Sequence, residues 1–363
     1  MLLQKKIKAI IIPILLIFLV SWNSVQSSPY WIRPGVYFIY TAKGDRSVIV
    51  ECNNGTIYFG KYGIFRWEIL DVSESSMLIN VSLEVHNATA YTVRTLSLEE
   101  GLKRSKDLIN RYSNLNYTKE NSCRFAKTKN DENITICEDD KVVLVSIQAP
   151  NYIHGLYVDK KEGYAQETLI SNIEVNLTRS ALIEVSLPDN AVYFRGKKLG
   201  MNTLFLTDMN VSGKRILEEW VIEEVKPLNA SVHTRFKTFK PPILLIRTNF
   251  YNNASNFALY DPSSGILLEG YTPVSPVWLA LGFKHVIFAE KEHFQKTKQP
   301  ITTSKDIYGF GMVLEETNAF KFEKQTLSGV EIPREGLIVL VISILSLLVV
   351  SYERFKANRL GKQ

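Results

Sequence analysis

Histidine and acidic side chains could carry hydrolysis or metal binding in this chain, but their spacing predicts neither. The histidines are far apart, and none has the i, i+4 partner of a helical zinc-protease motif. Adjacent acids on a strand point to opposite faces, so the acid pairs are better explained as solvated charge than as hydrolytic or Ca²⁺-binding pairs. The histidines are His86, His154, His233, His285 and His293, and the acid pairs are Asp139–Asp140, Glu218–Glu219 and Glu223–Glu224.

Glycine and nucleophile motifs give the same result. The chain has no serine-hydrolase elbow, no phosphate-binding loop and no dinucleotide-binding glycine motif. Gly309-Phe310-Gly311 lacks the third glycine and the helix that would follow it. The sequence therefore predicts no catalytic residue, no metal ligand and no cofactor. A hydrolase whose catalytic groups converge from distant strands stays open as one alternative.

The three cysteines favour one disulfide. Cys123 and Cys137 bracket a stretch rich in lysine, asparagine and aspartate, which predicts a polar loop. Outside the cytoplasm such a pair oxidises, and closing a loop of about 15 residues is worth roughly 3 kcal/mol in the chain-entropy model. Cys52 is then a buried thiol or an intermolecular partner, and three unpaired thiols are the alternative.

Asparagine sequons are more frequent than chance predicts for this composition. Nine Asn-x-Ser/Thr triplets occur, where random placement would give roughly three. In an exported chain they are candidate glycosylation sites on the surface, and an asparagine- and threonine-rich β surface without sugar is the alternative. The sequons are Asn54, Asn80, Asn87, Asn116, Asn133, Asn176, Asn210, Asn229 and Asn253.

The two ends of the chain predict export and membrane anchoring. Residues 1–28 have a basic start, an apolar run of about 12 residues and a small-residue cleavage region, which is typical of a signal peptide. A second apolar run, 336–352, is long enough for a transmembrane helix, assigned to 333–352, and a basic cytoplasmic tail follows at 353–363. An uncleaved N-terminal anchor and a buried C-terminal core helix are the alternatives.

The charge distribution agrees with these assignments. The net charge of the chain is +6, and the basic residues of the two membrane flanks account for all of it. The intervening span is formally neutral, so we expect no nucleic-acid partner. The expected location is the cell membrane, with a single span and an extracytoplasmic ectodomain.

The ectodomain is predicted to be mainly β, with antiparallel sheets forming a sandwich or a curled half-barrel. Apolar and polar residues alternate over 79–85, 173–177 and 183–187, which is typical of strands with one wet face. Asn54-Gly55 and the segment Tyr260–Leu268 predict hairpins. We expect a first β region at 29–96, a helix and polar loop at 97–140, and a second β region at 141–332.

Two further segments carry specific expectations. The apolar run Val277–Ala289 predicts a buried strand pair, and the charged stretch Glu290–Lys298 predicts a solvated loop. Trp67–Val72 and Trp220–Val225 share the pattern Trp-x-Ile-x-x-Val. Two related β units would produce this repeat, and so would chance in an aromatic-rich β protein.

The layout resembles a known group of proteins. The signal segment, the Trp-x-Ile-x-x-Val strands, the turn Gly196–Gly200 and the hairpin Tyr260–Leu268 together resemble uncharacterised cell-surface proteins of archaea. That resemblance implies a β ectodomain with a C-terminal anchor, and it brings no activity with it.

The expected function is binding or scaffolding at the cell surface, through a protein or glycan partner outside the cell. The alternatives are an accessory ectodomain of a membrane transport or assembly complex, and the hydrolase with a dispersed site. A binding surface must stay free of glycans, and no sequon lies between Asn253 and the anchor. The expected binding surface therefore lies within 257–330.

Overall fold

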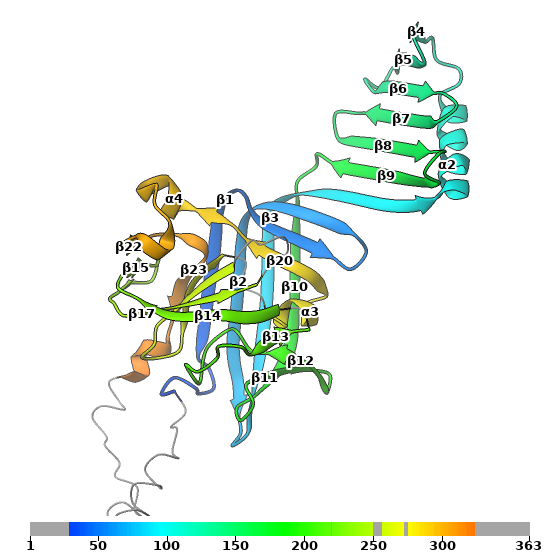
Figure 1. The fold of residues 1–363 in the computed structure, drawn as a ribbon. Helices are drawn as coiled ribbons and strands as arrows, with labels where there is room; N and C mark the ends of the chain where they lie inside the picture. Colours follow the sequence, from blue (N-terminus) through cyan, green and yellow to red (C-terminus); the bar gives the residue numbers. More distant parts are fainter. Residues whose placement is uncertain (1–28, 219, 250–255, 272–274, 324–363) are drawn as a thin grey trace, which may run out of the picture. The chain divides into compact units, whose positions relative to one another are not determined.

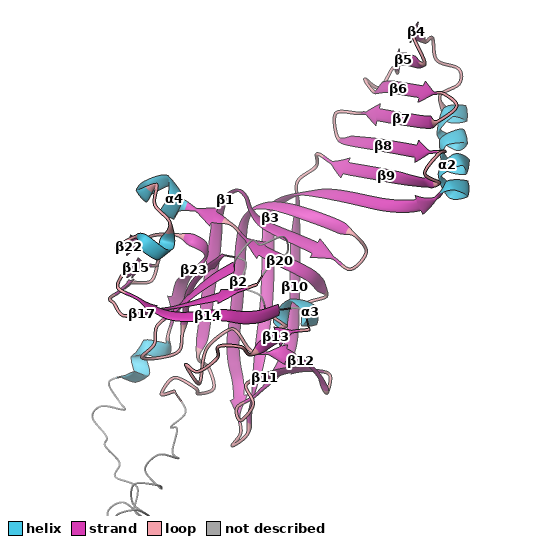
Figure 2. Ribbon diagram, viewed as in Figure 1, coloured by secondary structure: helices cyan, strands magenta, loops and turns pink. Residues whose placement is uncertain are grey.

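The structure is a computed structural model of the full chain, and it describes residues 29–218, 220–249, 256–271 and 275–323. This part of the chain is mainly β, with antiparallel pairing nearly throughout, as predicted (Figures 1 and 2). The signal segment, the apolar run 336–352 and the tail 353–363 lie outside the described residues. Within the described residues, no helix is both long enough and apolar enough to cross a membrane.

Three long strands and β10 form the centre of the large sheet. Each strand alternates buried and solvated residues, because one face packs on the core. The Asn54-Gly55 hairpin is confirmed, since Gly55 has φ +82° and Glu51 pairs with Ile57. The strands are β1 (Tyr37–Cys52), β2 (Thr56–Val72), β3 (Ser76–Ser97) and β10 (Val175–Ser186).

The sheet continues through the C-terminal strands. β1 pairs with β20 near its end and with β23 near its start, and β23 leads through β19, β18 and β17 to β14. The Tyr260–Leu268 hairpin is confirmed, with Tyr260 opposite Leu267 and Gly265 at φ +72°. These strands are β11 (Ala191–Phe194), β12 (Lys197–Met201), β13 (Arg215–Leu217), β14 (Trp220–Leu228), β17 (Ile243–Thr248), β18 (Asn256–Tyr260), β19 (Leu267–Tyr271), β20 (Phe283–Phe288), β21 (Glu290–Lys291) and β23 (Phe310–Thr317).

Aromatic side chains fill the core of this sheet. Trp31, from the segment before β1, is fully buried, and its indole N–H donates to the Ser264 carbonyl at 2.8 Å. Its ring packs edge-on against Phe38 and Phe205, at 5.3 and 5.2 Å. The start of the described chain is thereby fixed to the hairpin between β18 and β19.

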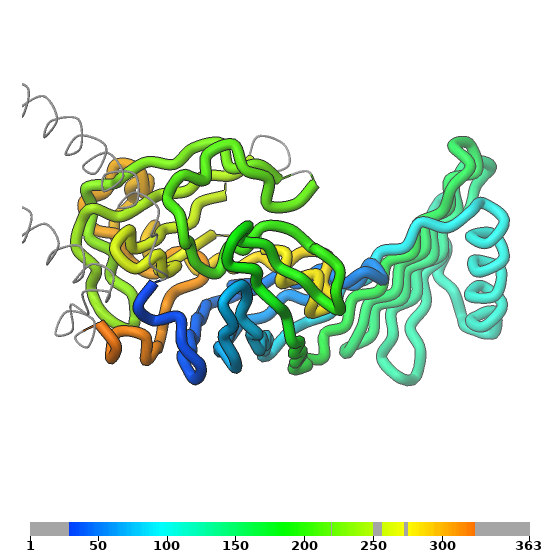
Figure 3. The backbone as a smooth tube through the Cα atoms, turned by 90° about the horizontal axis from the view of Figure 1, so that it is seen from below, coloured from blue at the N-terminus to red at the C-terminus, as the bar shows by residue number. Residues whose placement is uncertain are grey.

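The large sheet continues through the end of β3 into a section formed by β4 to β9, here called the smaller sheet, and α2 covers one of its faces (Figure 3). The helix expected after Leu98 is confirmed as α2 (Leu98–Arg111). Ser97 caps it by accepting from the Glu100 N–H. Gly101 lets it approach β9, because a Cβ there would lie 2.2 Å from that of Ala165. The strands are β4 (Thr118–Glu120), β5 (Cys123–Lys127), β6 (Asn133–Glu138), β7 (Val142–Gln148), β8 (Tyr152–Asp159) and β9 (Tyr164–Ser171).

The prediction of a polar loop between the helix and residue 140 is wrong. This stretch forms β4, β5 and β6, because Ile134 and Ile136 alternate with polar residues and pack under α2. The boundary at 141 is wrong for the same reason, since β7, β8 and β9 complete the smaller sheet.

Three local expectations also differ from the structure. The run Val277–Ala289 is the short helix α3 (Val277–Ala280), a turn at Gly282 and the single strand β20. The stretch Glu290–Lys298 is β21 followed by the helix α4 (Glu292–Thr297), which the fully buried His293 holds against the body. Ile173 lies before β10, and both Ile173 and Val175 are solvated, 55% and 40% exposed, so the alternation over 173–177 does not mark a half-buried strand.

Short elements complete the fold beside α4. β15 pairs antiparallel with β16 and parallel with β22, so this small sheet is the exception to the antiparallel pattern. The elements are β15 (Ser231–His233), β16 (Thr238–Phe239), η2 (Ile301–Thr303), β22 (Asp306–Ile307) and η3 (Ala319–Phe322).

Candidate functional site

An aromatic pocket of about 340 Å³ lies between α4, η2 and the strands β18, β19, β21 and β23. This volume is within the usual range for a small-molecule site. Its lining is mainly apolar and comes from these elements and the loop before η2. The lining residues are Phe257, Tyr271, Lys291, Phe294, Pro300, Ile301, Thr302 and Phe310.

Ring packing fixes the aromatic walls of this pocket. Phe310 stacks on Tyr271, with ring centroids 5.5 Å apart, and it meets Phe294 edge-on at 5.8 Å. Phe310 itself is almost fully buried, whereas Phe294 on α4 is 42% exposed at the rim. Such rings on packed elements give a ligand a preformed apolar surface.

The pairing of β21 with β23 determines which charged side chains face the pocket. Lys291 lies opposite Phe310 and Glu290 lies opposite Gly311 in the β21–β23 pair. Opposite residues of an antiparallel pair share a face, and consecutive residues point to opposite faces. Lys291 therefore lines the pocket beside Phe310, while Glu290 points into the body, where it is only 5% exposed.

Glu290 belongs to a buried ion network centred on Arg235. The guanidinium donates to the Glu290 carboxylate and to the Thr41 hydroxyl, at 2.9 Å for the hydroxyl, and its Nε lies 3.5 Å from Glu315. Glu290 also accepts from the Lys43 backbone N–H at 2.8 Å. Burial lowers the pKa of Arg235, but hydrogen bonding and charge from Glu290 and Glu315 outweigh it and raise the pKa overall.

Glu269 is a second buried acid behind the pocket. It is fully buried on β19, and neither carboxyl oxygen has a hydrogen bond of standard geometry among the described residues. Burial, and then the neighbouring charge of Glu290, raise the pKa of Glu269 well above its ordinary value, and Arg235 and the Phe310 backbone only partly oppose this. Glu269 is thus held in its neutral, protonated form.

Replacing Glu269 by glutamine is expected to remove a pH dependence of stability. An unfolded glutamate releases its proton above about pH 4.5, whereas folded Glu269 keeps it. Its contribution is therefore complete below pH 4.5 and is lost as the pH rises towards the raised pKa, at a limiting slope of about 1.4 kcal/mol per pH unit.

The measurement is urea unfolding of wild type and Glu269→Gln between pH 4 and pH 8. The free-energy difference between them should shift in favour of the variant as the pH rises. Glu218→Gln is the control, because Glu218 is exposed, and its difference from wild type should stay flat. Parallel pH curves for wild type and Glu269→Gln would contradict a protonated Glu269.

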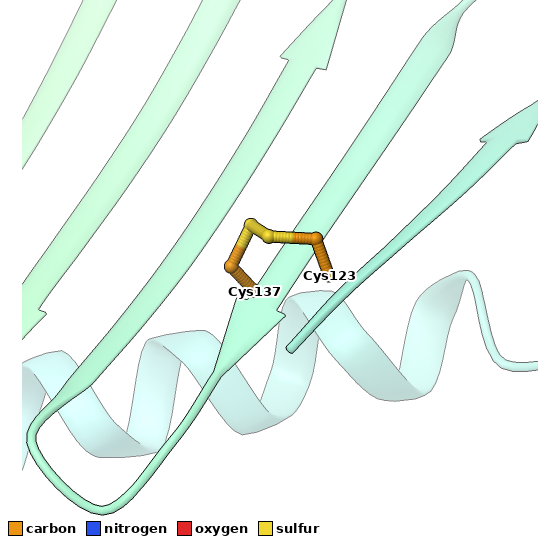
Figure 4. The surroundings of a disulfide bond; sticks show 2 residues. All are labelled: Cys123 and Cys137. Atoms are coloured by element: carbon orange, nitrogen blue, oxygen red, sulfur yellow. A yellow bond between two sulfur atoms is a disulfide. The ribbon is translucent and has the colours of Figure 1, made fainter. Parts of the chain in front are cut away.

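The predicted cysteine pair forms a disulfide in the structure (Figure 4). Cys123 and Cys137 lie directly opposite each other on β5 and β6, with Cα atoms 4.0 Å apart. Cys52, at the end of β1, is partly buried and free, and burial raises the pKa of its thiol. The bond lies within the smaller sheet and away from the residues that line the pocket.

The sequons are distributed over both sheets. Asn80 is partly buried on β3, and Asn253 lies outside the described residues. Asn176 accepts the Asn87 backbone N–H at 3.1 Å through its side-chain oxygen, which leaves its amide nitrogen, the atom that a glycan would use, outside this contact. The exposed sequons are Asn54, Asn87, Asn116, Asn133, Asn176, Asn210 and Asn229.

The histidines stay apart in the fold. Four of them contact different carboxylates, such as Glu167 with His154 at 3.0 Å and Asp306 with His233 at 2.9 Å. The fifth, His293, is buried and contacts the Gln299 carbonyl, and burial lowers its pKa. No group of three potential metal ligands gathers within the described residues.

The sequence predicts a surface free of sequons within 257–330, but it reveals neither the pocket nor the buried acids. A second hollow, an open polar groove of about 640 Å³, lies on the other side of the α4–η2 segment. Its lining includes Lys296, Thr303, Lys305 and Tyr308. A signal for the pocket was present as aromatic residues at strand ends, but nothing in their spacing indicated that they meet.

The chain matches no protein-family model, and no curated protein matches it at a significant level.

Proposed function

We propose that this protein is a membrane-anchored, extracytoplasmic surface protein that binds an apolar group of an external ligand in the aromatic pocket. The observation that carries this proposal is the set of aromatic walls held by β18, β19, β23 and α4. Of the charged side chains near the pocket, only Lys291 lines it. The buried acids are not among the lining residues, which favours binding over the hydrolase alternative.

The membrane assignment rests on the sequence and agrees with the fold. The core includes Trp31, three residues after the proposed signal peptide of residues 1–28. The proposed transmembrane helix is 333–352, with the basic tail 353–363 inside the cell. A disulfide between Cys123 and Cys137 suits an oxidising compartment.

The direction of β23 supports a role in which the pocket is presented to ligands outside the cell. β23 runs from Phe310 in the pocket wall to Thr317, where the Thr317 hydroxyl donates to the Tyr37 carbonyl. Eight residues of strand span about 23 Å between their ends. The pocket therefore lies at the end of β23 remote from the point where the chain leaves this unit towards the proposed anchor.

For the finer fold, we infer a curled half-barrel. The unbroken pairing order from β14 through β17, β18, β19, β23, β1, β2 and β3 to β10, together with a buried aromatic core, supports this assignment. The relationship to archaeal cell-surface proteins and the glycosylation of the sequons are further parts of the proposal.

An accessory role in a membrane complex is the second candidate. α2 covers one face of the smaller sheet, whereas the opposite face leaves Phe125 and Tyr164 39% and 40% exposed. Exposed aromatic residues on a sheet face are typical of protein contacts.

The proposed function is tested by photolabelling the full-length protein in lipid nanodiscs with 4-benzoylbenzamide, an uncharged two-ring probe. We expect saturable labelling of peptides that contain Phe257, Ile301 or Phe310. Thr302→Trp should abolish it, because Thr302 is an exposed residue that lines the pocket and a tryptophan there would fill it.

Thr303→Trp is the matched control for this experiment. It places the same side chain on the next exposed residue, which lines the polar groove instead. Labelling should survive in this variant. Equal loss in both variants, or no saturable labelling of the wild type, would overturn the pocket as a binding site.

A further inference from the structure

We infer that the ligand of the aromatic pocket is an apolar anion, a hydrophobic group that ends in a carboxylate, sulfate or phosphate. This inference rests on the proposed function and adds the charge of the ligand. It follows from the electrostatic balance around Lys291, the charged residue of the pocket lining.

Three acids near the pocket are already paired or buried. Glu290 is paired with Arg235 inside the body. Glu292, on the first turn of α4, is paired with Lys296 at 2.5 Å. Glu269 is fully buried and is not among the residues that line the pocket, and its burial favours the neutral form. None of these three carboxyl groups is therefore left to balance Lys291.

Lys291 has no ion pair with any residue in the described part of the chain. Its position opposite Phe310 on β21 places Lys291 beside an aromatic wall of the pocket. An ammonium in that place contributes most to binding when an anionic end of the ligand reaches it while the apolar part contacts the rings.

The polar groove on the other side of α4 does not satisfy the same criterion. Its Lys296 is paired with Glu292 and lies 4.7 Å from the Tyr308 ring, and Asp306 adds a negative charge. Of these two hollows, the aromatic pocket is the one that combines apolar walls with an unbalanced cation.

The test compares 4-benzoylbenzoate with its uncharged isostere 4-benzoylbenzamide on the full-length protein in nanodiscs. Half-saturation of pocket labelling should occur at about five- to tenfold lower concentration for the carboxylate, the gain expected from one partly exposed charge contact. Raising the salt concentration should shrink this preference and leave the amide unchanged.

Lys291→Gln should remove the preference for the carboxylate, and Lys291→Arg should retain it. Lys305→Gln, which changes the net charge equally but lines the polar groove, should behave as wild type. Equal affinity of the two probes for the wild type, or a preference that survives in Lys291→Gln, would overturn the anion inference and leave the pocket in place. Failure of both probes to label the pocket would overturn the proposed function as well.

Discussion

Replacing Arg235 by methionine is expected to lower the free energy of unfolding by about 3–5 kcal/mol. The substitution leaves the Glu290 carboxyl group buried without its guanidinium partner, with the Lys43 backbone N–H as its remaining donor. Removing one partner of a buried ion pair costs this much because the other charge loses its compensation. For a domain of this size the melting temperature should fall by about 10 °C.

A double variant separates this cause from lost packing. Arg235→Met combined with Glu290→Gln removes the unpaired carboxyl group and keeps an acceptor for the Lys43 N–H. Most of the lost free energy of unfolding should therefore be recovered. Lys284→Met serves as the control, since the pair of Lys284 with Glu51 is mostly exposed and should contribute less than about 1 kcal/mol. Calorimetry of the three variants decides the matter. A loss for Arg235→Met no larger than that for Lys284→Met would contradict the buried network.

The ion network centred on Arg235 shows why the sequence could not reveal the buried charges near the pocket. Thr41, Arg235, Glu290 and Glu315 come from four separate parts of the chain. They meet because β1 and β21 both pair with β23, while Arg235 reaches over from the segment between β15 and β16. No local spacing of residues encodes these pairings.

Local chemistry did predict the hairpins. Asn54-Gly55 and Gly265 impose left-handed turns that fix the register of the strands beside them. Alternation over 79–85 was similarly sufficient, because each inward residue of that stretch is buried. Such features depend on neighbouring residues alone, so they can be read from one sequence.

The errors arise where tertiary packing outweighs local pattern. The stretch Thr118–Lys127 is polar and mostly exposed, so it lacks the alternation of a half-buried strand. It forms β4 and β5 because β6 offers an edge and α2 covers the sheet that they extend. The helix α4 was missed for a related reason, since its single fully buried residue, His293, is of a polar type.

Trp31→Ala is expected to destabilise the protein by about 3–5 kcal/mol, the usual cost of truncating a large core aromatic residue. Trp31 is fully buried against Phe38, Trp67 and Phe205. Truncation opens a cavity among these rings and deprives the Ser264 carbonyl of its donor. Urea unfolding followed by near-UV circular dichroism measures the loss.

Trp31→Phe should recover more than half of this loss, because it restores ring packing without the hydrogen bond. Tyr164→Ala removes an exposed ring from the smaller sheet and should cost less than about 1 kcal/mol. A loss for Trp31→Ala as small as that for Tyr164→Ala would show that the segment before β1 is not part of the core. If the proposed signal peptide is cleaved, the mature chain should begin at or before Trp31, because a cut after Trp31 would remove this packing.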